Sequence, residues 1–123
     1  MEAWEDPVTK VQFYFSHSDA KFTTGVMVIP AGAALPKHNR PSAVENLVQV
    51  AGRCEMTVFD DSENKTIYEL KPGSYLSMEK GQFHIHANPY GEPSYTLFKA
   101  VGDITDIVAT LKKNFNSVRL ETL

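Results

Sequence analysis

Two stretches in which glycines bracket histidines and a glutamate constrain this 123-residue chain more than any other feature. The first runs from Gly32 to Gly52 and carries three polar residues at set intervals: His38, Arg40 and Glu45. The second runs from Gly73 to Asn88 and carries Glu79, Gly81, His84 and His86. Residues 53–72 separate the two stretches, so any site that combines them is built from distant parts of the chain.

The spacing places these polar side chains in pairs on common faces of extended chain. Side chains alternate along a strand, so His38 and Arg40 share one face, and His84 and His86 share another. Each pair sits about 7 Å apart along its strand, close enough to converge on one ion or small ligand. Imidazoles and charges persist in a protein interior only when they are paired, ligated or hydrogen-bonded. The pattern therefore predicts a binding site inside a β structure.

Both stretches resemble the paired motifs of the cupin superfamily. The first family motif is Gly, five residues, His-x-His, three or four residues, Glu, six residues, Gly, and this chain matches it with Arg40 in place of the second His. The second is Gly, five residues, Pro-x-Gly, two residues, His, three residues, Asn, and Glu79 replaces the Pro. The resemblance covers about half of the chain directly.

Composition excludes several classes of protein. The length predicts one domain over residues 1–123, large enough to bury a core. The net charge is −3 and no basic run occurs, so nucleic acid is not expected as a partner. A lone cysteine, Cys54, excludes an internal disulfide and argues against an oxidising compartment. No apolar run reaches the 18 residues of a membrane span, so we expect a soluble cytoplasmic protein without membrane contact.

Short strands separated by Gly and Pro turns follow one another along the chain. They are expected over 8–15, 21–29, 35–40, 45–50, 54–58, 66–70, 75–78, 83–87 and 94–101. Apolar residues at helical spacing then predict a helix from about Asp103 to Phe115, packed on the outside of the sheet. With the resemblance, the expected fold is all-β: a cupin-like antiparallel jelly-roll barrel over about 8–102 with one C-terminal helix. Residues 1–7 and 116–123 carry no clear pattern.

The run from Val26 to Ile29 is apolar on both faces of its strand. Such a strand is typical of one that is covered twice, by the barrel interior and by a second sheet or subunit. Cupins often pair through such sheets, so the resemblance implies a homodimer.

The resemblance also implies a divalent metal inside the barrel. Carried over by position, the ligands are His38, Glu45 and His84. Arg40 stands at the fourth position and cannot ligate, because a guanidinium stays protonated and has no free lone pair. His86 shares a face with His84 and can complete the set. Three histidines and a carboxylate suit iron, zinc, nickel or manganese.

A metal-free alternative is equally specific. In it, Arg40 pairs with Glu45 where the metal otherwise sits, and the barrel is a binding module for a small carboxylate or sugar, or holds an idle pocket. Arg40 and Gln49 are the candidate ligand-binding residues in either case. With a metal, the protein would be a metal-dependent isomerase, dioxygenase or lyase, among which the fold does not choose. The pattern assigns no catalytic residue, and metal content is the measurement that separates the alternatives.

Overall fold

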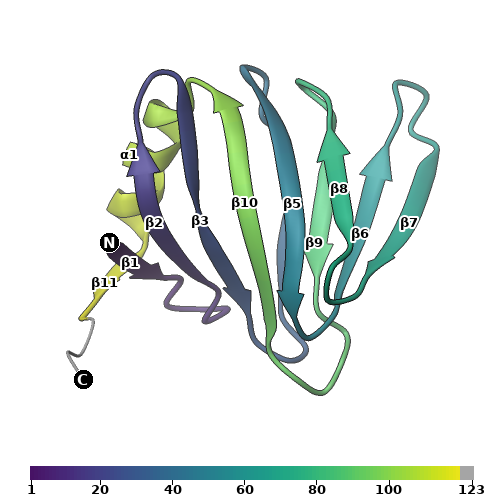
Figure 1. Cartoon of the computed structure of the whole chain (residues 1–123), viewed down its shortest axis with the longest axis horizontal. Coiled ribbons are helices and arrows are strands. Elements are labelled where there is room, and N and C mark those ends of the chain that lie inside the picture. The colour runs from purple at the N-terminus through teal and green to yellow at the C-terminus, as the bar shows by residue number, and fades with distance from the viewer. Residues whose placement is uncertain (120–123) are drawn as a thin grey trace.

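The computed structural model describes residues 1–119, of which 55% form strands and 8% form helix. These residues contain eleven strands in two sheets, all paired antiparallel, which confirms the expected jelly roll (Figure 1). In spatial order, the seven-stranded sheet consists of β11 (Asn116–Val118), β1 (Glu2–Glu5), β2 (Gln12–Ser18), β3 (Phe22–Ile29), β10 (Ser94–Gly102), β5 (Ala43–Ala51) and β8 (Tyr75–Met78). The four-stranded sheet consists of β4 (Ala34–His38), β9 (His84–Ala87), β6 (Cys54–Phe59) and β7 (Lys65–Leu70).

Alternating burial defines the inner face of each sheet. On β3 the inward residues are Thr23, Gly25, Met27 and Ile29, whereas Val26 and Val28 face outward and are half-buried. We expected β3 to be buried on both faces. Its inner face is buried, and its outer face is only half-buried. Cys54 is fully buried on β6 and has no disulfide partner, as expected of a residue that fills the core.

The helix α1 (Thr105–Asn114) forms where the sequence predicted it, but the prediction that it packs on the outside of the sheet is wrong. Its buried residue Val108, and Ile104 directly before the helix, belong to the same apolar core as the inward side chains of β2 and β10. The ring centroids of Phe13 on β2 and Phe115 at the helix end lie 6.0 Å apart. The physical reason is that the inner face of β2 carries large phenylalanines, which α1 covers (Figure 1).

The edges of the large sheet also differ from the sequence expectation. Strands β1 and β11 pair with each other where no pattern was found, because strands of three or four residues are too short to show alternation. The second strand begins at Gln12 rather than residue 8, since residues 6–10 form a turn in which the Asp6 carboxylate accepts from the amide of Val8 at 2.9 Å. It then continues to Ser18 through a register shift between Phe15 and His17. Residues 120–123 lie outside the described part of the chain.

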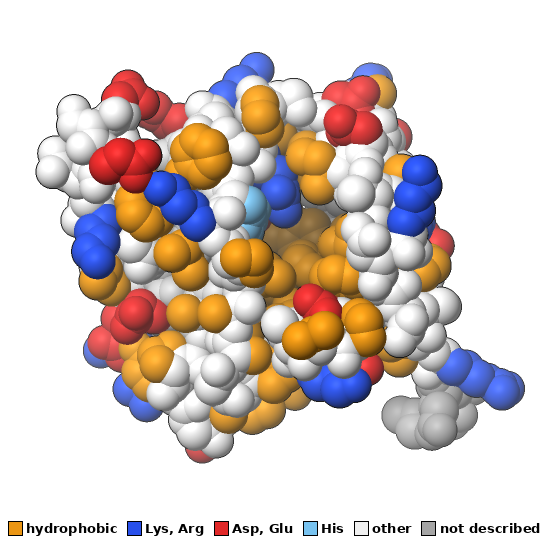
Figure 2. Space-filling view, turned by 180° about the vertical axis from the view of Figure 1, so that it is seen from behind, with side chains coloured by type: hydrophobic (Ala, Val, Ile, Leu, Met, Phe, Trp, Pro, Cys, Tyr) orange, Lys and Arg blue, Asp and Glu red, His pale blue; other side chains and the backbone are white. Residues whose placement is uncertain are grey.

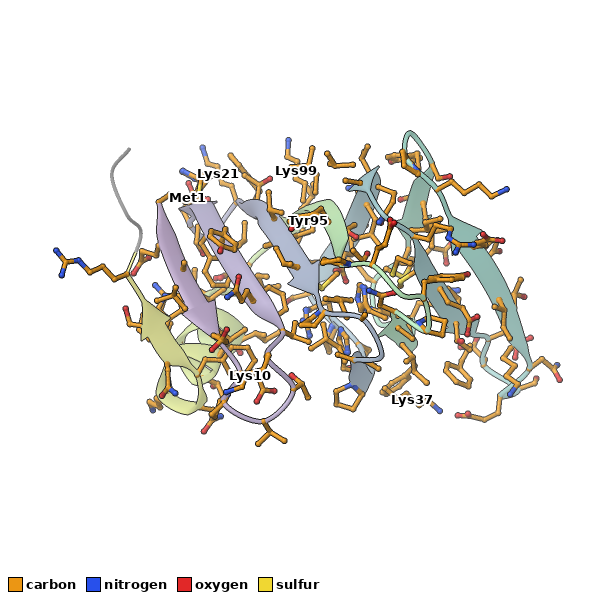
Figure 3. The ribbon with its side chains drawn as sticks, turned by 90° about the horizontal axis from the view of Figure 1, so that it is seen from below. Met1, Lys10, Lys21, Lys37, Tyr95 and Lys99 are labelled. Atoms are coloured by element: carbon orange, nitrogen blue, oxygen red, sulfur yellow. The ribbon has the colours of Figure 1, made fainter. Side chains whose placement is uncertain are left out.

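The outer face of the seven-stranded sheet is open. Figure 3 shows Lys99 pointing away from this face, on the side of the molecule opposite Lys37 of β4. Among residues 1–119, no helix is long and apolar enough to span a membrane.

Candidate metal centre

Two sheets bring four polar side chains to one point between them. His38 ends β4, His84 and His86 lie on β9, and Glu45 faces them from β5 of the larger sheet. The pairing of β4 with β9 sets His38 opposite His84. One possible ligand atom from each of the four residues lies within 4.8 Å of the others. The structure therefore brings together His38, Glu45 and His84, which the motif spacing selected, and His86, which was added because it shares a strand face with His84.

The Glu45 carboxylate stands among the rings. Its Oε2 lies 3.1 Å from His84 Nε2, and its Oε1 lies 3.9 Å from His86 Nε2. Glu45 is 7% exposed, and His84 and His86 are each 1% exposed. The His38 ring is close to both, with centroid distances of 4.4 Å to His84 and 5.3 Å to His86. This is a dense group of ionisable side chains in which Glu45, His84 and His86 are buried and His38 is half-buried.

Backbone carbonyls hold two of the rings in one tautomer. Nδ1 of His38 lies 2.7 Å from the carbonyl of Pro36, and Nδ1 of His84 lies 2.9 Å from the carbonyl of Gln82. A carbonyl only accepts, so each Nδ1 carries the hydrogen and each Nε2 keeps a free lone pair. Such a bond from the far nitrogen is the usual way in which proteins orient a histidine that binds a metal.

Four buried polar atoms in this group have no hydrogen-bond partner. Among the described residues, Nε2 of His38, Nε2 of His84, Oε2 of Glu45 and Nδ1 of His86 are buried and unpaired. With the His84 proton on Nδ1, its 3.1 Å approach to Glu45 joins two lone-pair atoms and is not a hydrogen bond. Unpaired buried polar atoms cost free energy, and a cation among the lone pairs of His38 Nε2, His84 Nε2 and Glu45 Oε2 would satisfy these three together. The four side chains thus could hold a metal ion.

The protonation states suit ligation as well. Burial lowers the pKa of His38 to about 4 and that of His86 to about 3. Burial alone would raise the pKa of Glu45, but the neighbouring side chains of His84, His86 and Arg40 outweigh it and bring that pKa to about 2. Near neutral pH, His38 and His86 are therefore neutral and Glu45 is ionised, the forms that bind metals.

Metal-free protein should lose stability as the pH falls from 7.5 to 5. His38 and His86 protonate near 6.5 in the unfolded chain but only near about 4 and about 3 in the folded chain. The unfolded state binds more protons in this window, so the free energy of unfolding should fall by about 2 kcal/mol for each histidine, or about 4 kcal/mol in all. Glu45, with its pKa lowered to about 2, adds a loss only below its ordinary value of 4.5.

Urea unfolding of chelator-treated protein at each pH measures this loss. His86→Phe should flatten the pH dependence because it removes one buried imidazole, whereas His17→Phe, at a side chain 45% exposed, should leave it. A free energy of unfolding that is constant across this window would contradict the buried neutral histidines.

Arg40 lies beside this group without joining it. Strand β4 ends at His38, so Arg40 follows the strand rather than extending it. Its Nη1 donates to the carbonyl of Asn39 at 3.3 Å, and within residues 1–119 it forms no ion pair with Glu45 at 4.0 Å or less. Burial lowers its pKa from the ordinary value, and Glu45 opposes that effect. The pairing of Arg40 with Glu45 that the metal-free alternative requires is not formed.

Gln49 faces inward on β5 as predicted, but its amide is engaged elsewhere. Its Nε2 donates to Ser94 Oγ at 2.9 Å and to the carbonyl of Ala51 at 3.0 Å, and its Oε1 accepts from Thr96 at 2.7 Å. It does not line the cavity beside the candidate centre. The structure does not bring Gln49 together with the other predicted site residues, and its ligand-binding role stays a prediction.

A narrow cavity of about 30 Å³ adjoins the four-residue group. His38, Arg40, Glu45 and His86 contribute to one part of its wall. The remainder of the wall is apolar and comes from β2, β3, β4, β10 and the α1 segment: Phe13, Phe15, Met27, Leu35, Phe98, Ala100, Ile104, Ile107, Val108 and Leu111. Figure 2 shows a hollow with a hydrophobic floor and with histidine and Lys or Arg atoms at its edge.

The apolar wall was not identified from sequence. The helical spacing of residues 104–115 was visible, but nothing in it shows which face of a sheet a helix will cover. The phenylalanines of β2 alternate as core residues do, so no local signal separates a cavity wall from ordinary core.

Sequence comparison finds no relative for this chain: no family model matches it, and no curated protein matches it. Solved structures do resemble it. The cupin domain of Cnp3 from Schizosaccharomyces pombe aligns with a TM-score of 0.67 at 19% identity, covering 81% of this chain and 70% of that one. An oxalate decarboxylase structure aligns with a TM-score of 0.69 at 18% identity over 89% of this chain and 28% of that one.

A recombinant oxalate oxidase in complex with glycolate aligns with a TM-score of 0.64 at 14% identity, covering 67% of this chain. The chain spans 42% of the length of that oxidase. All three identities lie below the range in which function follows from likeness, so these structures bear on the fold.

Proposed function

We propose that this chain, which has the cupin fold, binds one divalent transition metal between His38, Glu45, His84 and His86 and holds a small anionic or polar ligand beside it. The observation that carries the proposal is that one possible ligand atom from each of the four residues lies within 4.8 Å of the others. Three of the atoms in this group, His38 Nε2, His84 Nε2 and Glu45 Oε2, are buried acceptors without a hydrogen-bond partner. Three imidazoles and one carboxylate form a donor set that suits iron, zinc, nickel or manganese.

The chain's own residues define what such a centre would do. A bound metal would act as a Lewis acid toward an oxygen of the ligand. Arg40 lines the same cavity and supplies a cation for an anionic ligand. The carbonyls of Pro36 and Gln82 hold the rings of His38 and His84 in place. The apolar walls keep bulk water away from the ligand.

On this basis the protein is a candidate metal-dependent isomerase, dioxygenase or lyase. Structures of an oxalate oxidase and an oxalate decarboxylase share the fold, and the former was solved with glycolate, a small carboxylate. The fold hosts several chemistries and does not choose among them. Metal binding is therefore the first property to test.

Protein purified without a His tag should contain about one equivalent of a transition metal by elemental analysis. Metal that binds only the folded state stabilises it by about 2.7 kcal/mol at a hundredfold excess over Kd. Zinc, iron(II), nickel or manganese added after chelation should therefore raise the melting temperature by roughly 10 °C. Protein that contains no metal and does not respond to any of the four would reject the proposed centre.

The metal-free binding module remains the competing function. It depends on an ion pair between Arg40 and Glu45, and the nitrogens close to the Glu45 carboxylate instead belong to His84 and His86. The geometry therefore favours the metal.

A homodimer is proposed on separate grounds. Five neighbouring strands place side chains in register in one apolar row: Tyr14, Val26, Leu97, Val48 and Tyr75. This row lies on the outer face of the seven-stranded sheet, where Leu97 is 45% exposed and Tyr75 is 63% exposed. Sedimentation should show a dimer at micromolar concentration that Leu97→Lys converts to monomer; a monomeric wild type would contradict it.

The single-domain organisation and the cytoplasmic location stay predictions.

A further inference from the structure

The wall of the cavity beside the candidate centre has a polar end that contains one cation, and the rest of the wall is apolar. Arg40 stands near the polar end together with His38 and Glu45. Among residues 1–119, the remaining wall consists of hydrophobic side chains, and no second Lys or Arg lines it. A ligand that fits this distribution has one anionic group and an apolar remainder. A dianion would leave its second charge against hydrocarbon, which is costly.

The Arg40 guanidinium has hydrogen-bonding capacity to spare. A guanidinium has five N–H donors, and in the described part of the chain Arg40 makes one side-chain hydrogen bond, to the carbonyl of Asn39. It is half-buried and lies at the cavity wall. Charge-assisted bonds to a carboxylate are about twice as strong as neutral ones and are favoured where water is scarce. Arg40 is thus prepared to receive a carboxylate group.

The helix α1 supplies the wall that a ligand can adjust. Ile104 and Val108 are buried in the core, whereas Ile107 and Leu111 are half-buried and line the cavity. The cavity measures about 30 Å³, the liquid volume of about one water molecule. An aromatic ring requires a cavity of about 150 Å³. With the carboxylate at Arg40, little more than one methyl-sized group fits this volume, and each further methylene must displace Ile107 or Leu111.

We propose that the cavity selects small monocarboxylates with a short alkyl group, with Arg40 receiving the carboxylate and Ile107 and Leu111 limiting the length of the alkyl group. The proposal rests on the proposed function, because the carboxylate is placed next to the candidate metal centre. It goes further in naming the ligand class and in assigning specificity to a helix outside both histidine motifs.

Nuclear magnetic resonance titration with acetate, propanoate, butanoate and pentanoate tests this selection. We expect the wild type to bind propanoate at least tenfold more tightly than pentanoate, since one methylene in a well-fitted apolar pocket changes selectivity about 10- to 200-fold. Methyl signals of Ile107 and Leu111 should shift on binding. Leu111→Ala and Ile107→Ala should each restore pentanoate binding to within about threefold of propanoate.

Two further variants separate the selection for alkyl length from the binding of the carboxylate. Ile67→Ala makes the same chemical change as Ile107→Ala at an exposed position of β7 and should leave the order of affinities unchanged. Arg40→Gln should weaken all four acids by a similar factor, about tenfold, without changing their order. Melting curves confirm that each variant is folded.

The titrations are run on zinc-loaded and on chelator-treated protein. If the metal centre fails, the chelator-treated protein still carries Arg40 and α1, so the length selection is decided independently. Equal affinity of the wild type for propanoate and pentanoate would overturn the proposal. So would equal effects of Ile107→Ala and Ile67→Ala, unchanged affinity in Arg40→Gln, or no binding of any acid to either form.

Discussion

Replacing Glu45 with Gln is expected to weaken metal binding roughly a thousandfold. Glu45 is the only anionic group among the four candidate ligands, and it is 7% exposed. A unit charge at 4 Å contributes about 4 kcal/mol at an effective dielectric constant near 20, and each 1.4 kcal/mol is a tenfold change in affinity. Competition with a chromogenic chelator measures the affinity for zinc in the wild type and the variant.

Glu92→Gln is the matched control, since Glu92 is exposed in the loop before β10. It should leave zinc affinity within about twofold of the wild type. An affinity that Glu45→Gln leaves unchanged would reject the proposed centre. A loss of about 3–5 kcal/mol in the stability of metal-free Glu45→Gln would instead indicate that the Arg40 guanidinium depends on Glu45, as the metal-free alternative requires.

The second large effect is expected from Arg40→His, which should tighten metal binding by tenfold to roughly a thousandfold. The change removes a fixed positive charge from the cavity wall and introduces an imidazole at the position where the cupin motif has its second histidine. Both changes favour a bound cation, by up to about 4 kcal/mol for a charge 4 Å away before solvent screening. The same chelator competition measures the result.

Arg53→His serves as the control for this variant, because Arg53 stacks on Tyr90 at 3.8 Å and pairs with Glu69 away from the centre. It should not change metal affinity. Weaker metal binding in Arg40→His would show that Arg40 supports the centre rather than opposing it. Metal binding that exists only in Arg40→His and not in the wild type would reject the metalloenzyme hypothesis.

Much of the candidate site could be predicted because its residues obey local rules. Alternation along a strand shows that His84 and His86 share a face, and motif spacing selects His38 and Glu45. Their convergence depends on β4 pairing with β9 and on β5 facing both, which are contacts between distant segments. Sequence spacing alone contains no information on such distances, so the resemblance to a known family had to supply it.

Gln49 shows the limit of the same reasoning. Its face on β5 was predicted correctly, but four residues along a strand amount to about 13 Å from Glu45. At that distance its amide meets Ser94 and Thr96 of β10 rather than the candidate centre. The side of the sheet on which α1 packs was likewise undetermined, because an apolar stripe fits any apolar surface. The face of a strand on which a side chain lies can be predicted from the sequence. How far that side chain lies from a site, and which surface a helix packs on, cannot.

The single cysteine offers a direct view of how the chain opens. Cys54 is fully buried on β6, and burial raises its pKa to about 11, so a thiol reagent meets neither an exposed sulfur nor a thiolate in the folded state. Strand β6 pairs with β9, the strand of His84 and His86. The rate of alkylation therefore reports how often this part of the sheet separates. A metal ion or carboxylate that holds β9 in place should slow the alkylation of Cys54 in proportion to its occupancy. The alkylation rate thus measures binding without a label on the ligand and without an assay of enzyme activity.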